Sequence, residues 1–223
     1  SELSLSSGQT KFQGFTLMIM KRPQTITLAL TGASGMPYGM RLLERLLAAD
    51  RQVYLLYSQV AQIVAQQEMN MSLPSRPQEA ELFFNQLYNL PEGQLRVFGR
   101  EEWFAPVASG SNPADAMVIC PCSMGALAAI AAGMSQKLIE RAADVMLKEN
   151  RPLIIVPREM PFSTIHLENM LKLARCGAVI MPANPAFYHQ PQTIQEMVDF
   201  VVARILDHLS IEHGLMPRWG AER

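Results

Sequence analysis

The sequence predicts a single-domain α/β protein built on a doubly wound, Rossmann-like parallel sheet with helices on both faces. Short apolar runs typical of strands alternate with longer stretches of helical periodicity along the chain. Strands that are joined by helices run parallel through right-handed crossovers. Because neither an internal repeat nor an interdomain linker interrupts residues 20–210, we expect one domain over that range.

The first strand, turn and helix are predicted from residue 25 onward. Ile26, Leu28 and Leu30 mark the strand, residues 31–35 form a turn of small side chains, and leucine and methionine then recur at helical spacing. Such a turn aims backbone N–H groups and the positive end of a helix dipole at one point, which suits a phosphate. The glycines do not follow the G-x-G-x-x-G spacing of dinucleotide sites, so an ordinary strand-to-helix turn is an equal alternative.

The remaining elements follow as alternating strands and helices. Further strands are predicted at residues 53–57, 95–98, 116–119, 152–156 and 178–181. Helices are predicted around residues 60–64 and at 80–87, 126–132, 138–147, 164–176 and 193–209. Ser163 and Gly177 have the residue types of an N-cap and a C′ position at the two ends of one of these helices.

Apolar side chains form stripes on two of these helices. Val60, Ile63 and Val64 form one stripe at helical spacing. The predicted buried stripe of the last helix consists of Val198, Val201, Val202, Ile205 and Leu209. Arg204 lies among these residues, which indicates a buried ion pair at an interface or a functional cation.

The composition indicates a folded protein of a reducing, cytoplasmic compartment. The 223-residue chain is 49% hydrophobic and 17% charged, with a net charge of -1 and no basic run that would serve a nucleic-acid binder. Its three cysteines, Cys120, Cys122 and Cys176, are odd in number, and the Cys-Pro-Cys spacing matches neither a zinc site nor a thioredoxin-like motif. We therefore expect neither nucleic acid nor a metal as a partner.

No segment is predicted to insert into a membrane or to direct secretion. The most apolar run, residues 124–134, is too short and too rich in alanine and glycine to span a bilayer. Residues 1–19 lack the layout of a secretory signal and are expected to form a flexible leader or an expression remnant. Residues 211–223, with Pro217 and Trp219, are expected to lie as a tail on a neighbouring surface.

Polar side chains follow the carboxyl ends of five predicted strands. These are Ser34, Ser58, Cys122 with Ser123, Arg158 with Glu159, and Asn184. In an open parallel sheet, these ends share the edge at which ligands bind. Their coincidence predicts a ligand site at this edge better than any single motif does.

The groups available near this edge favour cofactor chemistry. Arg141 and Lys148, seven positions apart on one helix, are candidate partners of an anion, and Glu159 is the carboxylate of the site. No G-x-S-x-G or histidine pattern supports a hydrolase, and no Asp-rich motif would hold magnesium on a diphosphate. We therefore expect a bound cofactor to supply the reactivity and cations to hold a phosphate. Trp103 and Phe104 indicate either core packing or one wall of a pocket for a planar ligand.

Six motifs in order along the chain resemble those of the UbiX-type flavin prenyltransferases, formerly called 3-polyprenyl-4-hydroxybenzoate carboxy-lyases. They are TGASG (31–35), CPCSMG (120–125), LIERAADV (138–145), PRE (157–159), IHLENM (165–170) and the run 182–190, and the resemblance extends from about residue 24 to Gly220. It implies a flavoprotein-type fold and a metal-independent enzyme that transfers a dimethylallyl group from dimethylallyl monophosphate to N5 and C6 of reduced FMN. The product, prenylated FMN, would serve partner decarboxylases, including those of ubiquinone synthesis. A homo-oligomer, a dodecamer with sites shared between subunits, is also implied.

The resemblance also assigns roles to individual residues. The FMN-binding set is Gly32, Ala33, Ser34, Ser58, Ser123, Met124, Gly125, Arg141 and Arg158. The set that would bind the prenyl phosphate is Ser34, Arg141, Lys148, Tyr188 and Arg204. The catalytic set is Glu159 as the acid–base group near the leaving phosphate, Ser34, and Trp103 as an aromatic face near the allyl cation, with Trp219 as a second candidate for that face. For Glu159, a structural salt bridge to Arg158 or Arg141 is the alternative.

Three other functions agree with parts of this pattern. A flavin-dependent decarboxylase of the cysteine-peptide type resembles this family in fold and FMN use, but it is expected to have a catalytic histidine after the first helix, and residues 52–72 contain none. A carboxy-lyase in its own right lacks a suitable acid–base pair. A non-catalytic flavin carrier needs only one phosphate site, whereas this chain has cations for a second.

Overall fold

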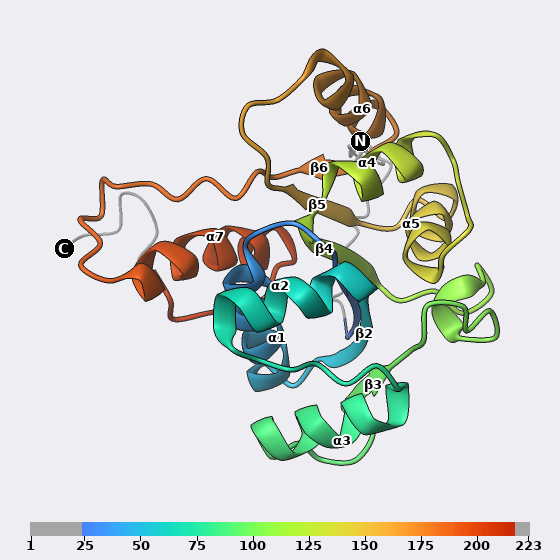
Figure 1. Ribbon diagram of the computed structural model, residues 1–223, viewed down its shortest axis with the longest axis horizontal. Helices are drawn as coiled ribbons and strands as arrows, with labels where there is room; N and C mark the ends of the chain where they lie inside the picture. The colour runs from blue at the N-terminus through green and yellow to red at the C-terminus, as the bar shows by residue number, and fades with distance from the viewer. Residues whose placement is uncertain (1–23, 217–223) are drawn as a thin grey trace, which may run out of the picture.

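A computed structural model describes residues 24–216, so the predicted leader at residues 1–19 and Trp219 lie outside the described residues. The core is a six-stranded sheet with the order β3-β2-β1-β4-β5-β6, in which every neighbouring pair is parallel (Figure 1). The predicted doubly wound, Rossmann-like α/β fold is thereby confirmed.

The predicted strands and helices are present, with small differences at their ends. The strands are β1 (Thr25–Leu30), β2 (Gln52–Tyr57), β3 (Leu95–Val97), β4 (Ala116–Cys122), β5 (Leu153–Pro157) and β6 (Val179–Ile180). The helices are α1 (Met36–Ala48), α2 (Gln59–Met69), α3 (Pro77–Tyr88), the short 3-10 helix η1 (Pro106–Ala108), α4 (Met124–Ala131), α5 (Leu138–Lys148), α6 (Thr164–Arg175) and α7 (Ile194–His208). α3 begins earlier than predicted because proline is favoured in the first turn of a helix.

Two apolar cores cover the two faces of the sheet. Side chains alternate along β1, so that Leu28 and Leu30 face one core and Ala29 faces the other, and all three are fully buried. Helices α1, α3 and α7 contribute to the first core, and α4, α5 and α6 contribute to the second (Figure 1). The central strands are therefore covered by helices on both faces, as predicted.

The chain reverses its direction across the sheet between β1 and β4. In a sheet of this kind, the reversal leaves a crevice outside the carboxyl ends of the two strands. Just beyond β1, the Thr31 hydroxyl donates to the carbonyl oxygen of Pro121 (2.8 Å) and accepts from the backbone N–H of Ser123 (2.8 Å). Because Thr31 is buried, this bridge holds the ends of β1 and β4 in a fixed relation.

The helix ends and the stripe of α7 agree with the local sequence signals. The Ser163 hydroxyl accepts from the backbone N–H of His166 at the start of α6, and Gly177 follows the helix with a φ of 95°. The predicted apolar stripe of α7 is buried. In the single chain the Arg204 side chain is 53% exposed and pairs with Asp207, so its burial at an interface between subunits stays a prediction.

Two of the three residues in the predicted apolar stripe of α2 face outward. Val60 and Ile63 are 52% and 54% exposed, whereas Ala61 and Ala65 turn toward the core. Small residues on the inner side allow α2 to lie close to the turn that follows β1, where Val60 approaches Gly32. An apolar stripe at helical spacing is thus present, but only Val64 of its three members packs against the core of its own chain.

The end of the described chain continues the first core. Ile211 is buried, and Leu215 packs against the same cluster as α7. The predicted tail therefore begins on a surface of its own chain. Within residues 24–216, no helix has both the length and the apolar character needed to cross a membrane.

We expect Thr31→Val to lower the free energy of unfolding by about 1–3 kcal/mol, because it leaves the Ser123 N–H without its acceptor at a buried position. Urea denaturation followed by circular dichroism measures the change. Thr31→Ser is the matched control, since it keeps the hydroxyl and removes only a methyl group. Equal losses in the two variants would show that the hydroxyl bridge adds nothing beyond packing.

Candidate active site

A cavity of about 250 Å³ lies outside the carboxyl ends of β1, β2 and β4, where the strand order reverses. Four residues of the expected FMN-binding set line it together, namely Gly32, Ser58, Ser123 and Gly125. The other lining residues are Thr31, Val60, Ala126, Lys137, Ile139 and Glu140. Residues from three separate strand ends and from the start of α5 thus share one cavity.

A second cavity, of about 290 Å³, continues from the first. The two have Ser58, Val60, Lys137 and Ile139 in common. The second cavity extends past Phe98 toward Arg100. Both have mostly apolar walls with a few polar groups, which is the usual character of a small-molecule site.

Three helices begin at the first cavity. Ser58 is the N-cap of α2, and its hydroxyl accepts from the backbone N–H of Ala61 (3.1 Å). Ser123 caps α4 in the same way through Ala126 (3.3 Å), and α5 begins beside the cavity after Lys137. The positive ends of the α2 and α4 dipoles therefore favour an anionic group in this space, whereas at α5 the Glu140 carboxylate already accepts from the backbone N–H groups of Gln136 and Lys137.

Glycine suits the two cavity positions, Gly32 and Gly125, for different physical reasons. A Cβ at Gly32 would lie 2.4 Å from Cγ1 of Val60, so α2 fits against the turn only because the side chain is absent. A Cβ at Gly125 would meet nothing within 4 Å, although the residue lines the cavity. The side of Gly125 is therefore open to a ligand, and a larger side chain there would extend into space that a ligand needs.

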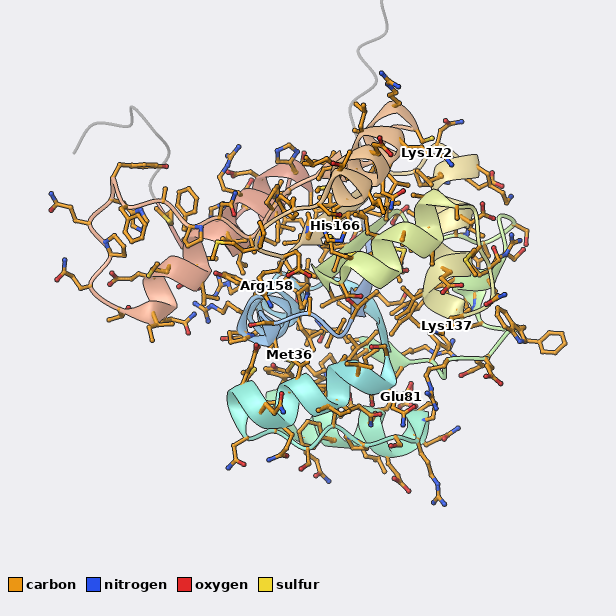
Figure 2. All side chains as sticks on the ribbon, turned by 45° about the horizontal axis from the view of Figure 1, so that its top comes forward. Met36, Glu81, Lys137, Arg158, His166 and Lys172 are labelled. Atoms are coloured by element: carbon orange, nitrogen blue, oxygen red, sulfur yellow. The ribbon has the colours of Figure 1, made fainter. Side chains whose placement is uncertain are left out.

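Arg158 connects the ends of three strands. Its Nε donates to the carbonyl oxygen of Ser34 (3.2 Å), and its backbone N–H donates to Cys122 (3.3 Å). In Figure 2, Arg158 lies near Met36 at the start of α1. Ala33, in the same turn as Ser34, is buried, and Met124 packs against the second core. Ser34 and Arg158 are thus adjacent, as a shared site requires.

Glu159 follows Arg158 at the carboxyl end of β5 and is exposed. Its carboxylate accepts from the backbone N–H of Met160 (3.1 Å). It has no ion pair with Arg158 or Arg141 in the part of the chain that the structure describes. The structural salt bridge considered as the alternative role is therefore not formed in the single chain.

Glu68 is a residue that the sequence analysis missed. Its carboxylate accepts from the backbone N–H groups of Gly35 (2.9 Å) and Met36 (2.8 Å) at the start of α1. These are the amides that a phosphate cradle at the first turn would have used, so the carboxylate takes the place of an anion there. Glu68 lies at the end of α2, 33 positions from the turn, and no local pattern points to it.

Arg141 and Lys148 do not line either of these cavities. Arg141 donates through Nε to the carbonyl oxygen of Ala108 (3.0 Å) and pairs with Asp144 (2.9 Å). Lys148, at the other end of α5 from the cavity, pairs with Glu149. These two cations therefore lie along the outer side of α5, against the segment around η1.

Trp103 and Phe104 lie in the segment that precedes η1. Trp103 is 45% exposed, and Phe104 is fully exposed. Core packing, one of the two interpretations of this aromatic pair, is therefore wrong for the single chain. Neither residue lines the two cavities at the switch point.

Tyr188 and Arg204 belong to a third region. Tyr188 contacts Phe200 of α7 edge to face, with ring centroids 5.8 Å apart. Arg204 and Asn184 line a separate cavity of about 340 Å³ between β6 and α7. Within one chain, the residues assigned to the prenyl phosphate thus lie in separate places: Ser34 at the switch point, Arg141 and Lys148 on α5, and Tyr188 and Arg204 near α7.

The cysteines after β4 have the properties of core residues. Burial raises the pKa of Cys122 to about 12 and raises the pKa of Cys120 further above its ordinary value. Both side chains therefore stay protonated near neutral pH, and neither is a thiolate nucleophile or metal ligand. Among the described residues, no group of three or more His, Cys, Asp or Glu is arranged to hold a metal ion.

The sheet order and the cavity at the switch point define an α/β protein of the nucleotide-binding type, and the family model described as Flavoprotein matches residues 17–206. The flavin prenyltransferase UbiX of Pseudomonas aeruginosa is 56% identical over 203 residues, 91% of this chain and 97% of that protein. The enzyme of the same name from Methanocaldococcus jannaschii is 44% identical and covers 87% of this chain and 98% of its own length. The chain belongs to the family of UbiX-type flavin prenyltransferases.

Solved structures agree with this membership. AnUbiX in complex with FMN and dimethylallyl pyrophosphate has a TM-score of 0.78 at 38% identity and covers 91% of this chain and 100% of its own. A dodecameric FMN-dependent UbiX-like decarboxylase from Escherichia coli O157:H7 has a TM-score of 0.77 at 39% identity, over 88% of this chain and 100% of its own. The peptidyl-cysteine decarboxylase EpiD, at 14% identity and a TM-score of 0.51, shares the fold alone; it covers 73% of this chain and 81% of its own.

Proposed function

We propose that this protein transfers a dimethylallyl group from dimethylallyl monophosphate to N5 and C6 of reduced FMN, giving prenylated FMN. One observation carries this conclusion above all. Gly32, Ser58, Ser123 and Gly125, which the family pattern assigns to the flavin, line a single cavity at the switch point of the sheet. Membership of the flavin prenyltransferase family supports the same reaction.

The cavity has the groups that FMN requires. The hydroxyls of Ser58 and Ser123 and the N-termini of α2 and α4 suit a phosphate, and the open side of Gly125 leaves room for a large ligand. Reduced FMN supplies the nucleophilic ring positions of the reaction. The residues of the chain bind and orient the two reactants and exclude water from them.

Ser34 and Glu159 are proposed to act on the leaving phosphate. Arg158 donates to the Ser34 carbonyl, so it holds the turn after β1 against the end of β5, where Glu159 follows. The Glu159 carboxyl group would give its proton to the departing phosphate oxygen and later accept the proton lost when the new ring is complete. The Ser34 hydroxyl would donate to the same phosphate, and Glu68 keeps the turn in place through Gly35 and Met36.

Neighbouring subunits are proposed to complete the phosphate site. Arg141, Lys148, Tyr188 and Arg204 lie outside the central cavity of their own chain. Fixed cations and a phenol donor near the phosphate stabilise the charge that develops as the allylic bond ionises. Trp103 precedes η1, and Ala108 of η1 accepts a hydrogen bond from Arg141. We therefore propose that the Trp103 ring faces the allyl cation in the same subunit contact that brings Arg141 to the phosphate. A closed homo-oligomer, a dodecamer by the family pattern, would bring these groups to a neighbour's Ser34.

The product would be used outside this protein. We propose that prenylated FMN is released to partner decarboxylases in the cytoplasm, including those of ubiquinone synthesis. The reaction closes a ring on the flavin and leaves the phosphate as the only other product. This chain therefore supplies a cofactor, and the decarboxylation is assigned to the partner.

Anaerobic incubation with reduced FMN and dimethylallyl monophosphate tests the proposal directly. Mass spectrometry of the extracted flavin is expected to show the mass of prenylated FMN. Dimethylallyl diphosphate in a parallel reaction establishes which prenyl donor is used. Bound FMN of unchanged mass with both donors would refute the transferase and favour a flavin carrier.

We expect Glu159→Gln to bind FMN normally but to slow prenyl transfer by about 100-fold or more, because the amide cannot deliver or take up the proton. Rates are measured anaerobically from the mass spectra, and FMN affinity is measured by quenching of flavin fluorescence. Glu168→Gln, an exposed carboxylate on α6, is the matched control. Unchanged turnover in Glu159→Gln would remove this residue from the mechanism.

Gly125→Leu is expected to weaken FMN binding by about tenfold or more, equivalent to about 1.4 kcal/mol, because the side chain would fill the cavity beside α4. The free energy of unfolding should not fall, since leucine is the better helix former and its Cβ has no neighbouring atom within 4 Å. Gly125→Ala should give a smaller effect in the same titration. If Gly125→Leu lowered the free energy of unfolding along with the affinity for FMN, the inference that Gly125 faces open space would be wrong.

A further inference from the structure

Two cations line the two cavities at the switch point. Lys137 lines both cavities, and Arg100 lines the far end of the second. No other lysine or arginine is among the residues that line these two cavities. In Figure 2, Lys137 lies toward α5, apart from Arg158 near the start of α1. The cations of the two cavities are therefore Lys137 and Arg100, whereas Arg158 lies beside Ser34, outside this lining.

Lys137 has no ion pair within residues 24–216, whereas the side chains of Glu140 and Arg100 form hydrogen bonds. The Glu140 carboxylate, in the same lining, accepts from the backbone N–H groups of Gln136 (2.9 Å) and Lys137 (3.2 Å). Arg100 donates to the side-chain oxygen of Gln59 (3.0 Å). Because Gln59 is neutral, Arg100 keeps its charge at the far end of the second cavity, and Lys137 is the only cation among the described residues that lines both cavities.

We infer that Lys137 binds the phosphate of FMN and sets the preference of this protein for FMN over unphosphorylated flavin. This inference rests on the proposed function, because it takes the cavity to be the flavin site. The Ser58 and Ser123 hydroxyls and the helix N-termini lie beside Lys137, so the phosphate would receive both neutral and charged donors. Neither Ser34 nor Arg158 takes part in this lining.

Separation of the two phosphates is the electrostatic reason for this placement. Two dianions close together in a site that excludes water repel each other strongly. A prenyl phosphate near Ser34 and a flavin phosphate near Lys137 avoid that repulsion, because a different set of donors holds each one. The Glu140 carboxylate in the same lining accepts from two backbone amides, which partly offsets its repulsion of a phosphate.

Titrations with FMN and riboflavin, followed by fluorescence quenching, test the inference on the full chain. Lys137→Gln is expected to raise the Kd for FMN by about tenfold, the range of a charge-assisted hydrogen bond, and to leave the Kd for riboflavin unchanged. Lys137→Arg should retain most of the preference. Lys172→Gln on α6 is the matched control, and it should not alter either Kd.

An unchanged ratio of the two Kd values in Lys137→Gln would overturn the inference, as would a wild-type protein that binds both flavins equally. Raising the salt concentration should weaken FMN binding more in the wild type than in Lys137→Gln. These outcomes are independent of prenyl transfer. A protein that prefers FMN through Lys137 yet forms no prenylated FMN would refute the transferase and leave the inference standing.

Discussion

The buried hydroxyl of Thr31 is the contact on which the site depends. It joins the end of β1 to Pro121, near the end of the adjacent strand β4, and to Ser123 just after that strand. Ser123 also caps α4, which presents Gly125 to the cavity. One side chain, with its hydrogen bonds directed to fixed backbone groups, thus sets the distance between the two central strand ends and the direction of a cavity wall.

Local chemistry explains why most of the fold was predictable. A parallel strand that is buried on both faces has a continuous apolar sequence. The ends of α6 are marked by local signals, since Ser163 caps the helix through the backbone N–H of His166 and Gly177 follows its last turn. Glu68 is the contrasting case, since its role arises only when α2 folds back over the turn after β1. The exposure of Val60 was unpredictable for the same reason. The helical spacing of apolar residues can be seen in the local sequence, but the direction in which they face depends on how the whole chain folds.

The candidate site was predictable where it follows from topology and unpredictable where it follows from helix rotation. Parallel strands must end at one edge, so Ser58 and Ser123 had to meet once the strands were recognised. Arg204 lies between Val202 and Ile205 in sequence, yet successive positions on a helix differ by about 100°. That rotation takes its guanidinium out of the apolar stripe and into solvent.

The ion pairs of the outer cations are compatible with a site that is completed by assembly. Arg141 pairs with Asp144, Lys148 with Glu149 and Arg204 with Asp207, and each pair is partly exposed. Exposed pairs of this kind contribute about 0–1 kcal/mol, so exchanging the carboxylate for a phosphate costs little. The same cation interacts far more strongly with a phosphate once a neighbouring subunit excludes water. In the proposed assembly, a chain would carry these cations on its surface at little cost and gain their full electrostatic effect once a neighbouring subunit completes the site.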